Sequence, residues 1–529
     1  MDITFLGHAG ALVDTAHGII LCDPWFNPAF FASWFPFPDN RGLLTDDSLA
    51  AIASPDYLYV SHSHDDHFDV AFLRDHVSKD AVVILPDFPT SDHRRALEAI
   101  GFRNFLETRN GEPVEVDGLR LLTHALIAPT DGAIGDSALA VADGTATLFN
   151  QNDAKPTDLD AIIEFGPYDG HLVQFSGAIW YPMVYRVPEE ERRTLGRRKR
   201  RNQFARATRF VREIGATTFF PFAGPPCFLD DELFHLNDLG TDDANIFPDQ
   251  ATVLAEAEAA GILNGRLTVP GTVVTLEGGA CSVTHPEPDG AALRPFTDKE
   301  HYLRGYQASA LPVIAAEKAS WPRHEVDVVT ELTDWWMPLL TRADHICAGV
   351  NGRVLLDVLD TAAADDGDDE DVQVVIDFLD RRVATWKGED CLYRFRIPRP
   401  LIERCIQRRD PDWVNALFLS CRFEAERDGP YNEFVYNFFR SLSTERMAYT
   451  ERYYSELAAP RDVFELHGYV IQRHCPHLQA DLTRWGSVEG SVLTCALHGW
   501  QFDLATGACL TSDDREIYAR PVGEAPGDP

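Results

Sequence analysis

Two short segments near the end of the chain each combine one cysteine with one histidine. The first is Cys475-Pro476-His477 and the second is Cys495-Ala496-Leu497-His498. Thiolate sulfur and imidazole nitrogen are common metal ligands, and the four side chains can serve one centre only if the two segments lie in facing loops. The chain is therefore expected to end in a small domain built around a metal–thiolate centre.

The alternation of cysteine and histidine indicates which centre this is. In a Rieske [2Fe–2S] cluster, two thiolates bind one iron and two imidazoles bind the other. A zinc finger uses the same atoms but normally places both cysteines before both histidines, so the order found here favours the cluster. Ala480 and Leu497 stand where respiratory Rieske proteins carry a disulfide, which favours an electron-delivery module of the oxygenase type. The predicted cluster ligands are Cys475, His477, Cys495 and His498.

A second group of metal-binding residue types lies near the start of the chain. The predicted buried strand Tyr57-Leu58-Tyr59-Val60 runs directly into Ser61-His62-Ser63-His64-Asp65-Asp66-His67, an H-x-H-x-D-H sequence. This is the metal loop of the metallo-β-lactamase fold, and its mixed nitrogen and oxygen donors suit zinc or non-haem iron. Asp23 is expected to hold this loop in place. The predicted catalytic metal ligands are His62, His64, Asp66 and His67.

Further ligands are expected at the ends of later strands. Asp153 follows the strand-like segment 147–152, where this fold supplies a bridging aspartate, and His235 is the candidate for a late histidine. No middle histidine is evident, and the residues considered for that position are His124, Asp131 and His171. An incomplete ligand set favours a mononuclear iron with open positions over a dizinc hydrolase.

Composition limits the cellular setting and the partners. With 529 residues the chain is too long for one hydrophobic core. It contains no apolar stretch of about 18 residues and no secretory leader, and its ten cysteines lack the spacing of a disulfide framework. We therefore expect a cytoplasmic protein without membrane insertion. The net charge of −36 excludes nucleic acid as an expected partner.

One segment of this acidic chain is strongly basic. Residues 192–212 contain a run of arginines, among them Arg197, Arg198 and Arg201. Arginine forks suit a diphosphate, so these three residues are candidates for substrate binding. The segment is also consistent with the solvated face of an amphipathic helix, or with a docking patch for an acidic ferredoxin.

The order of expected elements indicates three domains. Residues 1–290 alternate short strands with helices, as in a four-layer αβ/βα sandwich of the metallo-β-lactamase type. Residues 291–460 form a mixed α+β middle domain, with a strand expected over 346–358 and one long helix over 431–457. Residues 461–529 form the small all-β Rieske domain.

These features together resemble the CMP-N-acetylneuraminate hydroxylase-like family, and within it the actinobacterial branch that acts on UDP-N-acetylmuramate. The resemblance spans nearly the whole chain and includes Cys22-Asp23-Pro24-Trp25, the run from Phe31 to Asn40, and Ala223-Gly224-Pro225-Pro226-Cys227. It implies an O2-dependent monooxygenase that converts the N-acetyl group of this nucleotide sugar, a peptidoglycan precursor of the cell wall, to N-glycolyl.

The resemblance also implies a set of cofactors and partners. Electrons from NAD(P)H would reach the Rieske cluster through an external reductase or ferredoxin, and pass to a non-haem iron, with zinc as the alternative metal, at the His62/His64 site. Two other classes of protein remain open. One is a metal-dependent hydrolase of the lactonase or phosphodiesterase type with an accessory Rieske domain. The other is an electron-transfer or O2-reducing protein without an organic substrate.

Overall fold

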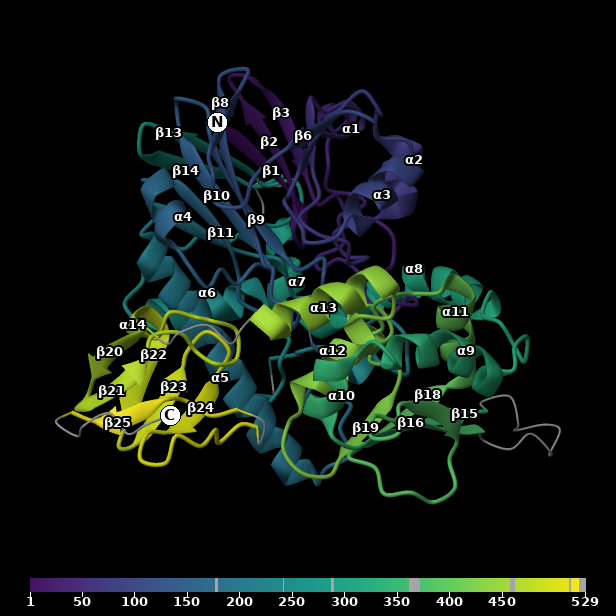
Figure 1. Ribbon diagram of the computed structural model, residues 1–529. Helices are drawn as coiled ribbons and strands as arrows, with labels where there is room; N and C mark the ends of the chain where they lie inside the picture. Colours follow the sequence, from purple (N-terminus) through teal and green to yellow (C-terminus); the bar gives the residue numbers. More distant parts are fainter. Residues whose placement is uncertain are drawn as a thin grey trace. The chain divides into compact units, whose positions relative to one another are not determined.

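The computed structural model in Figure 1 describes residues 1–176, 179–240, 242–286, 290–360, 372–456, 462–512 and 515–522. Their contacts divide the chain into two compact units. The first comprises residues 1–127, 134–321 and 414–423, and the second comprises residues 128–133, 322–413 and 424–529.

Two β-sheets form the centre of the first unit. The larger sheet has the order β14 (Ala280–Thr284), β13 (Val273–Glu277), β1 (Asp2–Gly7), β2 (Gly10–Thr15), β3 (Gly18–Cys22), β4 (Tyr57–Tyr59), β5 (Val82–Leu85), β6 (Phe105–Glu107). The smaller sheet has the order β12 (Thr218–Phe222), β11 (Gly170–Gln174), β10 (Thr147–Asn152), β9 (Ser137–Ala142), β8 (Leu119–Ala125), β7 (Val114–Val116).

The two sheets pack face to face. Phe5 and Tyr59 of the larger sheet belong to the same buried cluster as Leu121, Leu148 and Phe220 of the smaller one. Successive side chains of a strand point to opposite faces, so each of these strands buries one set of side chains between the sheets. Burying each such side chain contributes roughly 1.5–3 kcal/mol relative to leaving it exposed.

Helices cover the outer faces of both sheets. Helices α1 (Asp46–Ala53), α2 (Val70–His76) and α3 (Asp92–Ala99) contribute Ile52, Leu73 and Leu97 to a cluster beneath the larger sheet. Helices α5 (Glu189–Ile214) and α6 (Gln250–Ala259) cover the smaller sheet, and the short α4 (Asp160–Phe165) precedes β11. The four layers form the αβ/βα sandwich of the metallo-β-lactamase fold, which confirms the predicted fold class (Figure 1).

The first unit continues beyond the predicted boundary at residue 290. Helices α7 (Arg294–Thr297) and α8 (Lys299–Ala319) belong to it, because Leu303 and Tyr306 of α8 pack in one buried cluster with Phe35 and Phe37.

The second unit begins with a five-stranded sheet and its helices. The strand order is β17 (Arg382–Thr385), β16 (Val372–Asp377), β15 (Arg353–Leu359), β18 (Tyr393–Pro398), β19 (Glu424–Arg427). The accompanying helices are α9 (Val328–Leu340), α10 (Asp344–Val350), α11 (Arg399–Arg408), α12 (Glu433–Arg440) and α13 (Thr444–Glu456). A core of aromatic rings joins them, with Trp336 lying 5.0 Å from Trp413 and 5.7 Å from Phe438 between ring centroids.

Two details differ from the sequence-based expectation in this region. The segment 346–358 is not one strand, because residues up to Val350 complete α10 and the chain reverses at Asn351, whose φ is 45°. The single helix expected over 431–457 is two helices, α12 and α13. Asn432 caps the start of α12, because its side chain accepts a hydrogen bond from the N–H of Phe434.

The end of the second unit is small and mostly β-structured, as predicted for the Rieske domain. It contains the sheets β20 (Val463–Leu466), β21 (Tyr469–Gln472), β25 (Ala519–Pro521) and β22 (Gly486–Glu489), β23 (Val492–Cys495), β24 (Trp500–Asp503), with the short helix α14 (Leu482–Trp485). Within the part of the chain that the structure describes, no helix combines the length and apolar character needed to cross a membrane.

Candidate metal centre and Rieske site

The metal loop follows β4 and is held by side chains from two other segments. The N–H of Ser61 donates to Asp23 Oδ1 at 2.7 Å, and Asp23 Oδ2 lies 3.1 Å from His67 Nδ1. His93 Nε2 lies 3.1 Å from the carbonyl oxygen of Val60. A carboxylate on one nitrogen of an imidazole orients the ring and leaves the other nitrogen for a metal. Asp23 thus supports the loop as predicted.

His62, His64 and Asp136 form a first group of donor atoms, all within 4.8 Å of one another. His62 Nε2 lies 2.7 Å from His64 Nδ1 and 3.4 Å from Asp136 Oδ1. Two ligands that are each about 2.1 Å from one ion lie roughly 3 Å apart, so these separations suit a shared metal.

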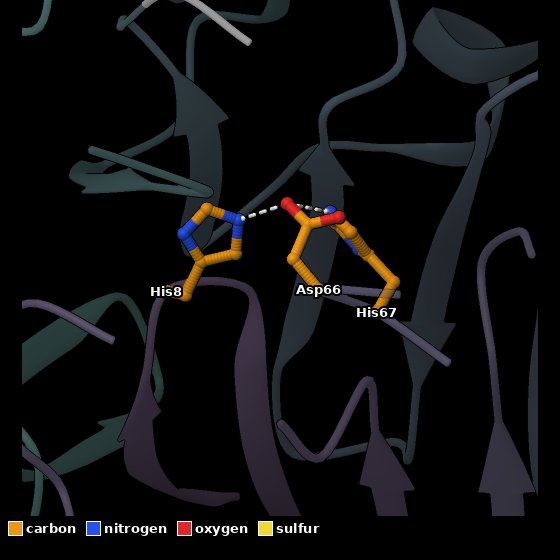
Figure 2. Close-up of side chains that lie close together, drawn as sticks. All are labelled: His8, Asp66 and His67. Carbon is orange, nitrogen blue, oxygen red and sulfur yellow. Dashed lines mark hydrogen bonds and ion pairs between the residues drawn. The ribbon is translucent and has the colours of Figure 1, made fainter. Parts of the chain in front are cut away.

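His8, Asp66 and His67 form a second group. Figure 2 shows the Asp66 carboxylate between the two imidazoles: Asp66 Oδ2 lies 3.0 Å from His8 Nε2 and 3.8 Å from His67 Nε2. Asp153 Oδ2 lies 3.5 Å from His67 Nε2, and Asp153 forms a third group with His62 and His67. Because His62 belongs to the first group and His67 to the second, Asp153 lies between the two groups and would be available to ions held by either of them.

The charges in this cluster favour a bound cation. Burial, assisted by the neighbouring histidines, lowers the pKa of His62 well below its ordinary value. Burial has the same effect on His67, but three carboxylates, with Asp153 first, outweigh it and raise the pKa of His67 well above the ordinary value. Burial also opposes ionisation of Asp66, yet His67 and His8 lower its pKa to about 2. A buried position that stabilises a proton among carboxylates stabilises a metal ion for the same electrostatic reason.

Several buried donor atoms of the cluster form no hydrogen bond. These atoms are His64 Nε2, His67 Nε2, Asp66 Oδ1 and Asp153 Oδ1. Leaving each of them unsatisfied costs roughly 1–3 kcal/mol, which a metal ligand avoids. The residues therefore fit a metal centre. Each of the three groups has two imidazoles and one carboxylate, the donor set of non-haem Fe(II) oxygenases, although zinc uses the same atom types.

Five of the predicted metal-binding residues come together: His62, His64, Asp66, His67 and Asp153. His235 does not join them, because it is exposed on the short 3-10 helix Phe234–Leu236. His171 Nε2 lies 2.8 Å from Gln151 Oε1, which identifies it as a buried structural histidine. His8 and Asp136 complete the cluster and were missed by the sequence analysis.

The two missed residues occupy the ends of other strands. His8 follows β1 and Asp136 directly precedes β9. His8 lies in the turn Gly7-His8-Ala9-Gly10, and a histidine between glycines is a detectable signal in the sequence. Few residues other than glycine adopt the positive φ that His8 has in this turn. His8, Asp23 and Asn152 have positive φ values of 51°, 40° and 40°. Such conformations cost on the order of 1–3 kcal/mol each and are concentrated at functional sites.

The completed ligand set predicts two metal ions per chain instead of one, since the first and second groups share no residue. Replacing Asp136 by alanine, or His8 by alanine, is expected to lower the bound metal from two ions to about one. Metal analysis of the purified variants measures this directly. His76→Ala is a matched control, because His76 is an exposed histidine on α2. Full metal content in both ligand variants would contradict the assignment.

The arginines predicted to bind substrate lie mostly outward on α5. Arg197 Nε donates to Asp243 at 2.8 Å, and both Arg198 and Arg201 are exposed. The residues that α5 turns toward the protein include Gln203, which is 1% exposed. The predicted arginines therefore match the solvated face of an amphipathic helix, which was one of the readings open at the sequence level.

The four predicted cluster ligands lie in two facing loops of the second unit. Cys475 and Cys495 are fully buried and their thiols are within hydrogen-bond distance of each other, so that burial and then Cys495 raise the pKa of Cys475 well above its ordinary value. The rings of His477 and His498 are 5.1 Å apart between centroids. His477 Nδ1 is buried and forms no hydrogen bond. Adjacent thiols, adjacent imidazoles and an unsatisfied ring nitrogen fit a Rieske cluster.

A buried carboxylate contacts one of these histidines. Glu433 Oε2, at the start of α12, lies 3.4 Å from His477 Nε2. Glu433 is fully buried and forms an ion pair with Arg515, and it accepts a hydrogen bond of 3.1 Å from the hydroxyl of Tyr454. The His477 ring also stacks on Trp500, with centroids 4.0 Å apart. Glu433 is therefore the acidic neighbour of a predicted cluster ligand.

Replacing Glu433 by glutamine is expected to raise the reduction potential of the cluster. Reduction adds negative charge, which a nearby carboxylate disfavours, so removal of that charge favours the reduced form. A tenfold shift of the one-electron equilibrium corresponds to about 59 mV, and we expect a rise of roughly this size. A redox titration followed by EPR gives the potential. An unchanged or lower value would show that Glu433 only supports the fold.

Comparison with known proteins identifies two segments of the second unit. Residues 328–456 match the model of the Rv3818-like, SCP2-like domain, and residues 446–517 match that of the Rieske [2Fe-2S] domain. With the sandwich of the first unit, these findings define a Rieske iron–sulfur protein that also carries a metallo-β-lactamase-type domain.

Relatives of the same length place the chain in a family. A Rieske 2Fe-2S iron-sulfur protein of Mycolicibacterium smegmatis is 46% identical over 98% of this chain and 99% of its own length. Rv3818 of Mycobacterium tuberculosis is 45% identical, again over 98% of this chain and 99% of its own length. The chain belongs to this family of Rv3818-like Rieske 2Fe-2S proteins. The names of these relatives state the cluster and no substrate.

Solved structures similar to the chain include both hydrolases and a β-hydroxylase. Igni18, a metallo hydrolase of Ignicoccus hospitalis, is 18% identical and covers 52% of this chain and 98% of its own, with a TM-score of 0.35. CmlA, a diiron β-hydroxylase of Streptomyces venezuelae, is 14% identical and covers 54% of each chain, with a TM-score of 0.33. Similarity at this level carries no functional information.

Proposed function

We propose that this protein is an iron-dependent monooxygenase that hydroxylates the N-acetyl methyl group of UDP-N-acetylmuramate to give the N-glycolyl form. The observation that carries the reaction type is the donor set: all three groups of candidate ligands combine two imidazoles with one carboxylate. The substrate comes from the resemblance of the chain to the hydroxylases of nucleotide-activated amino sugars.

The two centres supply complementary chemistry. Non-haem iron activates O2 against a C–H bond, and a Rieske cluster passes electrons one at a time. The balance of the reaction is R–CH3 + O2 + 2 e− + 2 H+ → R–CH2OH + H2O, with NAD(P)H as the electron source through an external reductase or ferredoxin. One C–H bond is broken, one C–O bond forms, and the second oxygen atom leaves as water.

The residues of this chain have separate tasks in that reaction. The seven side chains of the cluster would hold the metal ions; they are His8, His62, His64, Asp66, His67, Asp136 and Asp153. Asp23 keeps the His67 ring oriented, and the buried setting excludes bulk water from the ligand atoms. Cys475, Cys495, His477 and His498 would hold the cluster. The methyl group is small and apolar, so recognition of the substrate depends on the rest of the nucleotide sugar.

Mass spectrometry of UDP-N-acetylmuramate tests the proposal. After incubation with the protein, a reductase, NAD(P)H and 18O2, the sugar should gain one 18O atom, and no product should form under nitrogen. Retention of the label identifies O2 as the oxygen source. Absence of any oxygenated product from an iron-loaded, reducible protein would contradict the proposal.

A second candidate is hydrolysis, because two metal groups that share no residue also suit a two-metal hydrolase. That function predicts zinc at the site and turnover of a phosphodiester or lactone under nitrogen. Metal analysis together with the anaerobic assay separates the two functions.

A further inference from the structure

The inward face of helix α5 carries basic side chains near the metal centre. Lys199, Gln203 and Arg206 are separated by four and three residues, so they lie along one face of the helix. Gln203 is 1% exposed, and its Oε1 forms no hydrogen bond. Lys199 and Arg206 are half-buried residues.

The chain topology brings this face to the edge of the sheet that carries Asp153. Strands β10, β11 and β12 are parallel, and α5 returns from the end of β11 to the start of β12. Ala207 packs against Phe175, just after β11, so the preceding residues of α5 lie at or beyond this edge. A 26-residue helix is about 39 Å long and a five-residue strand about 17 Å, so the first half of α5 extends past the strands, as Figure 1 shows. Asp153 and Lys155 follow β10 at the same edge.

The charges of these groups act on one another and on the neighbouring Asp153. Burial, then the charges of Arg206 and Lys155, lower the pKa of Lys199 to about 7. Burial lowers the pKa of Arg206 to about 10, against the attraction of Asp153. Three cations gathered in a partly desolvated place repel one another, and a bound anion would relieve that repulsion.

Two lysines near this face, Lys155 and Lys199, lack the carboxylate partners that arginines elsewhere on the same helix have. Among the described residues, no carboxylate lies within ion-pair distance of Lys155 or Lys199. Three other arginines of α5 do have such partners, at N–O distances of 3.0, 2.8 and 2.8 Å: Arg193 with Asp242, Arg197 with Asp243, and Arg200 with Asp238. In a chain with 83 acidic and 47 basic residues, two unpaired lysines beside a metal cluster indicate a site for an anion from outside.

We propose that Lys155, Lys199 and Arg206 bind the diphosphate of a nucleotide sugar and so hold the sugar beside the metal centre. This inference rests on the proposed function, and it moves substrate recognition from the outward arginines of α5 to its inward face. A diphosphate matches the three cations better than a single carboxylate does, because it carries more charge and more acceptor oxygens for ammonium and guanidinium groups.

Binding of UDP to the iron-loaded protein under anaerobic conditions tests the site without catalysis. Calorimetry should show that Lys199→Gln raises the Kd for UDP about tenfold, whereas Lys199→Arg has a Kd close to the wild-type value. The double variant Lys155→Gln/Lys199→Gln should bind UDP more weakly than Lys199→Gln. Arg192→Gln is the matched control, because Arg192 lies on the same helix and pairs with Glu189. An unchanged metal content and an unchanged EPR signal of the Rieske cluster show that the variants are folded.

The outcomes separate this inference from the proposed function. Unchanged affinity of Lys199→Gln for UDP, or no binding of UDP to the wild-type protein, would overturn the inference even if the sugar is hydroxylated. Loss of affinity in Lys199→Gln supports the site even if no hydroxylation is found. An equal loss of affinity for UDP in Arg198→Gln would show that the outward face of α5 binds the diphosphate. If Lys199→Gln binds UDP-N-acetylmuramate more weakly but binds UDP and UDP-N-acetylglucosamine as the wild-type protein does, then the cations bind the lactyl carboxylate. The assignment to the diphosphate would then be wrong.

Discussion

Replacing His64 by alanine should reduce hydroxylation of UDP-N-acetylmuramate by more than about 100-fold. Loss of a residue that merely orients a metal ligand typically costs 10–100-fold in metal affinity or activity, and loss of a ligand itself costs more. His64 belongs to the first donor group, and its Nε2 is buried without a hydrogen bond, as expected for a metal ligand. The EPR signal of the reduced Rieske cluster should remain, because the cluster ligands belong to the other compact unit.

The comparison with His235→Ala makes this result specific. His235 is exposed and lies outside the three donor groups, so its replacement should leave metal content and turnover within about twofold of the wild-type values. If His235→Ala lost activity and metal while His64→Ala kept them, the late histidine expected from the sequence would be the true ligand. The assignment of His62, His64 and Asp136 as metal ligands would then be wrong.

Replacing Cys475 by serine should abolish the Rieske cluster. Cys475 is fully buried next to Cys495, and the N–H groups of His477 and Leu478 donate to its sulfur, so no other side chain can take its place. The reduced wild-type protein should give a rhombic EPR signal that the variant lacks. Hydroxylation that depends on an external reductase should fall to background, while the metal bound in the first unit stays unchanged.

A matched substitution separates loss of the cluster from loss of the fold. Cys509→Ser changes a partly exposed cysteine of the same small domain that is not a predicted ligand, so it should keep the signal. A colourless wild-type protein that binds zinc at these four residues, even after anaerobic reconstitution with iron and sulfide, would replace the Rieske assignment by the zinc alternative.

The predicted ligands that the structure brings together have their partners close by along the chain. The H-x-H-x-D-H loop places four donors within six positions, and a strand before it aims them, so local geometry alone predicts a metal site there. Each Rieske loop likewise carries its cysteine and histidine within four residues. The H-x-H-x-D-H loop, together with the alternation of short apolar strands and polar helix-like segments, predicted the sandwich, because hydrophobic periodicity is a local property of a strand or helix.

Other local patterns were ambiguous, and packing decided between the alternatives. Residues 346–350 are apolar enough for a strand, but they form the end of α10, where Gly349 lets the ring of Phe434 approach closely. The expected helix over 431–457 is interrupted at residues 441–443, where Trp335 Nε1 donates to the carbonyl oxygen of Leu442. Contacts between distant segments override local propensity in both places.

Only the tertiary structure determined the rest of the candidate metal centre. His8 is 58 residues from Asp66, and Asp136 is 74 residues from His62. His8 follows β1 and Asp136 precedes β9, and both residues reach the cluster because these strand ends lie at the same edge of the sandwich. His235 had a suitable place in chain order but is exposed, and the arginines chosen on α5 face solvent while Lys199 and Arg206 lie on its inward side. The amino-acid sequence thus determines the residue types and the local loops, whereas the ligand set and the direction of each helix face depend on how the sheets pack.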